Sequence, residues 1–170
     1  MKVFIEEQKF TKPLVIIALS IAFIGVVVSN IKDWEKIAQG SISEKIGALS
    51  GFLLIIAVAF LFINLKLKTK IDENGVHYQF FPINISFRLI AWDSISNCYL
   101  RKYNAVFEYG GWGMKFNFTK KIGRSFTTKG NIGLQLKLKN GKKILIGTQR
   151  KEEIERVLRN YHYKISNNEI

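Results

Sequence analysis

The sequence predicts a membrane α-helical hairpin followed by an all-β domain that one C-terminal α-helix caps. Three observations support this prediction: two long apolar runs within the first 65 residues, a two-residue alternation of apolar and polar side chains after them, and an amphipathic stripe near the end of the chain. With 170 residues, the chain is long enough for both spans and one compact domain.

Charge divides the chain at the same place as hydropathy. Residues 1–65 carry six basic and five acidic side chains, whereas residues 66–170 carry twenty basic and eight acidic ones. Apolar residues make up 48% of the chain and Cys98 is its single cysteine, so neither a disordered chain nor a disulfide framework fits this composition. We therefore expect the apolar part and the basic part to occupy different surroundings.

Two segments are apolar enough to cross a bilayer. Residues 13–31 and 46–65 contain no charged side chain, and at a rise of about 1.5 Å per residue each spans a hydrocarbon core of roughly 30 Å. One alternative is a pair of buried core helices, for which the rest of the chain offers too little apolar cover. The other is a cleaved signal peptide, but the first run is long for one and lacks a small-x-small site after it.

The distribution of lysines predicts the orientation of the two spans. Residues 32–45 balance three lysines with three acids, whereas residues 1–12 carry three lysines with two acids and residues 66–70 carry three lysines with no acid. These flanking lysines are Lys2, Lys9, Lys12, Lys66, Lys68 and Lys70. By the positive-inside rule we expect a multi-pass protein of the cell membrane with residues 1–12 as a cytoplasmic N-terminal segment, residues 32–45 as a short external loop, and both termini in the cytoplasm.

Two small residues lie one helical turn apart in the second span. Gly47 and Gly51 form a Gly-xxx-Gly pattern, which lets two helix backbones approach closely. Packing of the hairpin on itself and a seam between two copies of the chain are both compatible with this pattern.

Beyond residue 65 the period of the pattern changes from helix to strand. Strand-like runs separated by turn residues follow at 66–71, 76–81, 86–92, 96–103, 112–118, 125–128 and 134–146, the last being a hairpin around Asn140-Gly141. They predict seven or eight antiparallel strands in two packed sheets or a partly open barrel.

A C-terminal helix is expected after the last strand. Thr148 is a suitable N-cap, and Ile154, Val157, Leu158 and Tyr161 form one apolar stripe at helical spacing. The β domain is thus expected to span residues 66–162, followed by a frayed tail at 163–170.

Four runs in this region resemble the pleckstrin-homology-like (PH-like) domains of bacterial membrane proteins. These runs are Ile90-Ala-Trp-Asp-Ser-Ile95, Glu108-Tyr-Gly-Gly-Trp-Gly113, Gly130-Asn-Ile-Gly-Leu-Gln-Leu136 and Ile146-Gly-Thr-Gln-Arg-Lys-Glu-Glu153. They are similar to a group of small proteins in which a two-helix membrane hairpin precedes such a domain. The resemblance covers about residues 10–162 and implies two packed sheets capped by a helix. It departs at Lys151, where a proline is expected, and it implies no chemistry.

Motifs for catalysis or metal binding are missing from the sequence. Gly110-Gly111-Trp112-Gly113 lacks the spacing of a phosphate-binding loop and is typical of a bulge or a sharp strand entry. His77 and His162 have no Cys, Asp or Glu at metal-ligand spacing, and Cys98 has no obvious histidine partner. We therefore expect no catalytic residue, no metal and no cofactor, and hence a protein that is not an enzyme.

The basic residues are the remaining candidates for function. Lys66, Lys68 and Lys70 share one face of the strand next to the second span, where each contributes about 1 kcal/mol of attraction to an anionic leaflet. We therefore expect these three lysines to contact lipid headgroups. A more distant group is either a basic binding surface or a solvated face: Lys120, Lys121, Arg124 and Lys129. A further basic group surrounds the Asn-Gly turn: Lys137, Lys139, Lys142 and Lys143.

Two functions are compatible with these features. The first is a membrane-anchored, non-enzymatic binding or scaffolding module for a protein or peptide. The second, less expected, is a nucleic-acid binder held at the membrane, for which Tyr99, Tyr103 and Arg101 offer a weak stacking motif. Phosphoinositide binding is not implied, because the turn Asp72-Glu73-Asn74-Gly75 is short and acidic where well-known pleckstrin-homology domains carry a basic loop.

Overall fold

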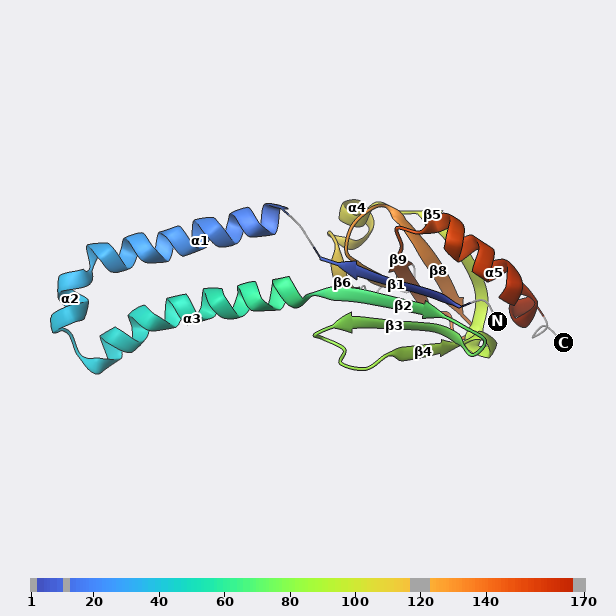
Figure 1. Cartoon of the computed structure of the whole chain (residues 1–170), viewed down its shortest axis with the longest axis horizontal. Helices are drawn as coiled ribbons and strands as arrows, with labels where there is room; N and C mark the ends of the chain where they lie inside the picture. Colours follow the sequence, from blue (N-terminus) through green and yellow to red (C-terminus); the bar gives the residue numbers. More distant parts are fainter. Residues whose placement is uncertain (1–2, 11–12, 117–122, 167–170) are drawn as a thin grey trace. The chain divides into compact units, whose positions relative to one another are not determined.

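A computed structural model describes residues 3–10, 13–116 and 123–166 of the chain, coloured along the sequence in Figure 1. The chain forms two units. One is helical and comprises Thr11–Asn64, and the other is rich in β-structure and combines Met1–Phe10 with Leu65–Ile170. The β-rich unit is therefore assembled from two parts of the chain that the helical unit separates.

The helical unit contains three helices: α1 (Pro13–Lys32), α2 (Trp34–Gln39) and α3 (Ile42–Asn64). Helices α1 and α3 are long and apolar enough to cross a membrane. Phe23 of α1 packs edge-on against Phe52 of α3, with ring centroids 5.9 Å apart. The segment 32–45, which was expected as a short loop, contains α2 and the first turn of α3. Helix α3 starts at Ile42 and stops at Asn64, so Leu65 belongs to the β-rich unit.

Four strands form one sheet of the β-rich unit, here called sheet A. They follow the order β1 (Phe4–Lys9), β2 (Lys66–Ile71), β3 (Gly75–Phe81) and β4 (Arg88–Ala91), and every neighbouring pair is antiparallel. The alternation that predicted a strand at 66–71 is realised in β2, where Leu67, Thr69 and Ile71 are buried.

Five strands form the second sheet, sheet B, in the order β5-β8-β9-β7-β6. Their bounds are Ile95–Lys102 for β5, Gly113–Phe116 for β6, Arg124–Thr127 for β7, Ile132–Leu138 for β8 and Lys143–Gly147 for β9. The 3-10 helix η1 (Trp92–Ser94) precedes β5, and the short helix α4 (Ala105–Tyr109) follows it. Strand β7 pairs with β9 in parallel, which corrects the expected all-antiparallel arrangement, and the sheets do not close into a barrel within the described residues.

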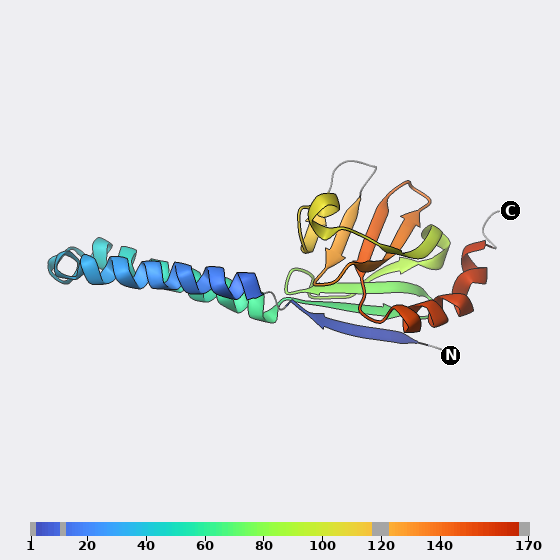
Figure 2. The ribbon, with the colours of Figure 1, turned by 90° about the horizontal axis from the view of Figure 1, so that it is seen from above.

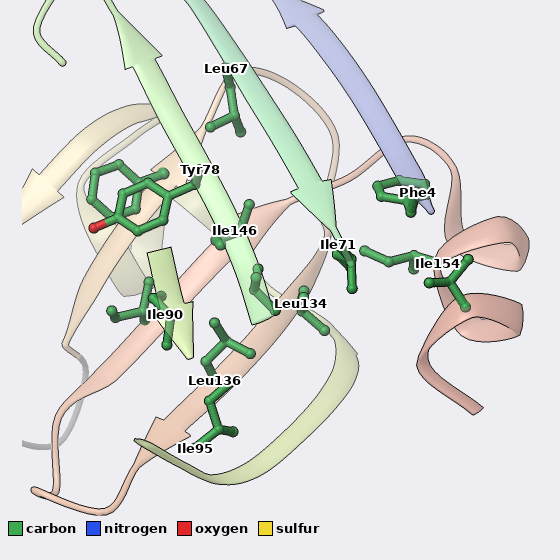
Figure 3. Packing of buried hydrophobic residues seen from close by; sticks show 14 of the residues in the cluster. Phe4, Leu67, Ile71, Tyr78, Ile90, Ile95, Leu134, Leu136, Ile146 and Ile154 are labelled. Atoms are coloured by element: carbon green, nitrogen blue, oxygen red, sulfur yellow. The ribbon is translucent and has the colours of Figure 1, made fainter. Parts of the chain in front are cut away.

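One apolar core joins both sheets and the last helix, α5 (Lys151–Ser166). Figure 3 shows Leu67, Ile71 and Tyr78 of sheet A facing Leu134, Leu136 and Ile146 of sheet B. The Tyr78 and Phe126 rings meet across the sheets with centroids 4.5 Å apart, and Tyr161 of α5 stacks on Trp92 at 5.5 Å. Figure 2 shows the strands of the two sheets crossing one another.

Helix α5 differs in its bounds from the sequence expectation. It begins at Lys151 rather than directly after Thr148. The Thr148 hydroxyl donates to the Glu6 carboxylate at 2.7 Å and accepts the Arg150 backbone N–H at 3.1 Å. It also continues to Ser166, so the tail expected at 163–170 is helical in its first half; residues 167–170 lie outside the described part.

Strand β1 is the main departure from the sequence expectation, which treated residues 1–12 as a separate segment. Its inward residues Phe4, Glu6 and Gln8 are all buried. The Glu6 carboxylate accepts the Gln149 backbone N–H at 2.8 Å in addition to the Thr148 hydroxyl. The Gln8 amide donates to the Gly147 carbonyl at 2.7 Å and accepts from the Thr128 hydroxyl at 2.8 Å.

The β1–β2 pairing brings the two ends of the helical unit together. Lys9 pairs with Lys66, and just beyond them the Phe10 backbone N–H donates to the Leu65 carbonyl at 2.9 Å. The helical unit is thus an insertion between two adjacent strands of sheet A, and the strand at 66–71 is the second strand of the domain rather than its first.

This arrangement predicts that the β-rich unit folds without the helices only if β1 is kept. Replacing residues 11–64 by the two-residue turn Asn-Gly joins Phe10 to Leu65 in their native register, since two-residue loops suit antiparallel neighbours. We expect this chain to be soluble and folded, as judged by amide dispersion in NMR spectra. A chain starting at Leu65 loses the burial of Phe4, about 2 kcal/mol or more, and the partners of Thr148 and Gln149. Equal stability of the two chains in denaturant would contradict the role assigned to β1.

Candidate functional site

Four lysines lie on the outer face of β1 and β2 in sheet A, from the end where β1 stops and β2 starts to the opposite end of β2. They are Lys9, Lys66, Lys68 and Lys70, here called the basic face. Lys9 lies directly opposite Lys66 across the β1–β2 ladder, so the two side chains share one face of the sheet. The three lysines that the sequence singled out are thus brought together, and β1 adds a fourth.

Two carboxylates lie among these lysines and partly neutralise them. Glu7 of β1 is 3.6 Å from the Lys66 ammonium and 3.3 Å from that of Lys68. Asp72, in the β2–β3 turn, is 2.9 Å from the Lys70 ammonium and 3.0 Å from His77 Nε2. The Lys66 ammonium also lies over the Phe81 ring, 5.7 Å from its centroid. Four lysines therefore face two acids, and the surface retains an excess of positive charge.

The two carboxylates respond to these neighbours. Burial alone would raise the pKa of Glu7, but the hydrogen bond and charge of Lys68 together with the charge of Lys66 outweigh it and lower the pKa below its ordinary value. For Asp72 burial likewise acts to raise the pKa, yet Lys70, His77 and the Asn74 backbone N–H hold it well below its usual range. Both groups are therefore ionised at neutral pH.

The distal basic residues do not join the basic face. Lys120 and Lys121 lie outside the described residues. Arg124 begins β7 in sheet B, with its guanidinium 5.2 Å from the Phe116 ring centroid, and Lys129 is exposed in the β7–β8 turn. Lys137 lies on sheet B with its ammonium 5.5 Å from the Tyr99 ring centroid.

The residues that were weighed for chemistry have structural roles. Glu108 bonds the Arg101 guanidinium at 2.7 Å, and Asp93 is an exposed residue of η1. Gly110 and Gly113 adopt positive φ around α4 and the start of β6, as a sharp strand entry requires. Within residues 3–10, 13–116 and 123–166, no three His, Cys, Asp or Glu side chains gather where a metal ion would be held.

Two cavities lie in the helical unit, but polar side chains that border them bind to groups at the ends of its own helices. One, of about 430 Å³, is bordered by Asp33, Lys36, Glu44 and Gly47, and the other, of about 460 Å³, is largely apolar. Lys36 pairs with Asp33 at 3.5 Å, and Glu44 accepts the Ser41 backbone N–H at 2.7 Å.

The two glycines of the second span differ in surroundings. A Cβ at Gly51 would lie 3.3 Å from Val26 of α1, whereas a Cβ at Gly47 would have nothing within 4 Å. Gly51 therefore serves packing within the hairpin, and a seam between two copies of the chain stays a prediction.

Lys9 was not predicted from the sequence to belong to the basic face, nor Glu7 to lie among its lysines, because strand β1 was not expected. The signal was faint: the alternation in Phe4-Ile-Glu-Glu-Gln-Lys9 places an acid and an amide inward, against the usual apolar pattern.

The surroundings of Asp72 predict a pH-dependent contribution to stability. A carboxyl group whose pKa is lowered by folding stabilises the fold above its unfolded pKa, near 4, and this contribution fades as the pH falls through the folded pKa. We expect Asp72→Asn to lower the free energy of unfolding by about 1–2 kcal/mol at pH 7 and by progressively less below about pH 4. Denaturant unfolding of the full chain in detergent measures this, with exposed Asp93→Asn as the matched control. A loss that is constant with pH would contradict the assignment.

Comparisons with known proteins do not assign this chain to a family. No family model matches the chain, and no curated protein and no solved structure is significantly similar to it. A function for the basic face has to be argued from its residues and from their place in the chain.

Proposed function

We propose that this chain is an integral protein of the cell membrane that presents its β-rich unit at the cytoplasmic surface as a non-enzymatic binding or scaffolding module. In this proposal α1 and α3 cross the bilayer, and the basic face contacts anionic lipid headgroups. The observation that supports it most is the Phe10–Leu65 hydrogen bond, which holds both ends of the helical unit at one place, with Lys9 and Lys66 of the basic face beside it.

The exposure of α1 and α3 and the pairing of β1 favour membrane-spanning helices over core helices and over a cleaved signal peptide. A core helix of a soluble protein is mostly buried, whereas none of the residues in α3 or in the span Val15–Lys32 is buried. Cleavage of α1 as a signal peptide would separate β1 from the chain, although β1 completes sheet A and carries Glu6 to the start of α5. Retention of both helices is the consistent interpretation.

The strand pairing also bears on topology. Because Phe10 and Leu65 are adjacent, two spans that start and end there enter and leave the bilayer on the same side. The lysines of the basic face flank both spans at that side, which the positive-inside rule assigns to the cytoplasm.

The PH-like identity is part of the same proposal and rests on the four sequence runs. Two of them mark joints of the fold: Trp92 is buried between β4 and β5 and donates to the Asp72 carbonyl at 2.9 Å, and the run ending at Glu153 leads from β9 into α5. Two sheets with a C-terminal helix are compatible with the fold that the resemblance implies. The acidic turn at Asp72 joins β2 and β3, and the helical unit stands between the first two strands.

The nucleic-acid alternative is weaker. The Arg101 guanidinium, its main candidate contact, is engaged by Glu108, by the Tyr109 hydroxyl at 3.0 Å and by the Gln135 side chain at 3.0 Å. The basic groups also lie on different sheets instead of forming one stripe along which a backbone of phosphates would run.

Cysteine labelling tests the topology. Ser41 lies between α2 and α3 and Asn140 lies between β8 and β9, and both are exposed. Burial raises the pKa of the Cys98 thiol to about 12, so the background reaction is low. We expect a membrane-impermeant maleimide to modify Ser41→Cys in intact cells and to modify Asn140→Cys only after lysis. The reverse pattern would place the β-rich unit outside.

Lysine footprinting tests headgroup contact without any substitution. In nanodiscs of anionic lipid, acylation of Lys66 and Lys68 is expected to slow about five-fold relative to neutral lipid, as about 1 kcal/mol per lysine implies. About 1 M salt, with a Debye length of about 3 Å, removes the difference. Lys137 and Lys142 in the same molecule serve as controls, and equal slowing of all four lysines would contradict a specific role for the basic face.

A further inference from the structure

The connection between β3 and β4 exposes three large apolar side chains in a row of alternating positions. Ile83, Ile85 and Phe87 are 50%, 82% and 47% exposed, although isoleucine and phenylalanine are among the residues most often buried in soluble domains. No acidic residue occurs from Phe80 to Ala91, and Arg88 follows the apolar positions. The segment therefore combines an apolar tip with a basic flank.

The loop is held in shape by the rest of the sheet, so its apolar side chains are not exposed by local unfolding. The Asn84 backbone N–H donates to the Phe80 carbonyl at 2.8 Å, and the Gln79 side-chain amide donates to the Ile85 carbonyl. Gln79 itself is buried in β3, opposite Lys68 of β2. The exposed side chains thus project from an ordered turn.

The position of this loop in sheet A indicates what covers it. Strand β3 runs antiparallel to β2 and its last residue, Phe81, pairs with Lys66, the first residue of β2. The loop therefore continues past the end of the ladder at the same edge where Leu65 joins α3. Figure 1 shows the β3–β4 connection at the end of the sheet where β1 stops and β2 begins.

We infer that the β3–β4 loop inserts Ile83, Ile85 and Phe87 into the interfacial zone of the bilayer, as a third point of attachment beside the two spans. This inference rests on the proposed membrane anchoring. The loop lies at the edge of the sheet where Leu65 directly follows α3. An exposed apolar tip at this place lies within reach of the interfacial zone, in which apolar faces are buried about 5–10 Å into the headgroup and acyl boundary. Lys66, which pairs with the last residue of β3 at the base of the loop, is placed to meet phosphates.

The same face of sheet A supplies a matched control position. Leu89 is 50% exposed, like Ile83, but it pairs with His77, which pairs with Lys70. Lys70 lies four residues further along β2 than Lys66, or about 13 Å at the rise of a strand. Leu89 is thus equally apolar and lies toward the end of the ladder opposite to Leu65.

Depth-dependent quenching in nanodiscs tests the inference with the full chain. An environment-sensitive fluorophore is attached to Ile85→Cys, Leu89→Cys or Leu53→Cys in a Cys98→Ala background, Leu53 being an exposed residue in the middle of α3. The quenchers are nitroxide lipids that carry the spin label either near the headgroup or near the end of the acyl chain. We expect the Ile85 probe to be quenched by the shallow lipid at least about two-fold more than the Leu89 probe, and the Leu53 probe to be quenched by the deep lipid.

The three probes separate failure of the loop from failure of the anchor. Quenching at Leu53 with equal, weak quenching at Ile85 and Leu89 would overturn the inference, leave the spans in place, and identify the loop as a surface for a protein instead. An unquenched Leu53 probe would overturn both the anchor and the loop insertion.

Discussion

The pairing of β1 with β2 is the constraint on which the rest of the structure depends. It joins two segments that the whole helical unit separates in the sequence, and it ends in the hydrogen bond from Phe10 to Leu65. A long insertion adds little entropic cost to such a pairing, about 0.6 kcal/mol per doubling of loop length, and a hairpin returns the chain to its starting point. This one strand pair therefore adds the N-terminal segment to the β domain and brings the two ends of the helical unit together.

The polar interior of β1 explains why this strand belongs where it does. A buried carboxylate is costly unless hydrogen bonds compensate it, and Glu6 has the Thr148 hydroxyl and the Gln149 N–H. The same two bonds fix the segment between β9 and α5, and Arg150 reaches back to the Ile5 carbonyl at 2.8 Å. The first strand thus holds the segment that leads into the last helix.

These contacts mark the limit of what the sequence predicts. The apolar spans, the alternation in β2 and the stripe of Ile154, Val157 and Tyr161 are local patterns, and the structure has a helix or strand at each. Strand β1 was not predicted, because Glu6 and Gln8 face inward and their hydrogen-bond partners are more than 100 residues away in the sequence. The parallel β7–β9 pair and the Glu7 contacts are likewise non-local. Lysines 66, 68 and 70 were predicted to share a face, but not the acids that lie among them.

The acids give the basic face a property that lysines alone would lack. Exposed ion pairs such as those of Glu7 with Lys66 and Lys68 are worth only about 0–1 kcal/mol, so a lipid phosphate that replaces the carboxylate exchanges one weak contact for another. Glu7 itself is repelled by an anionic leaflet, which offsets part of the attraction of its two lysines. In the proposed lipid contact, adhesion of this face would depend on lipid charge and salt, whereas α1 and α3 would provide the membrane attachment.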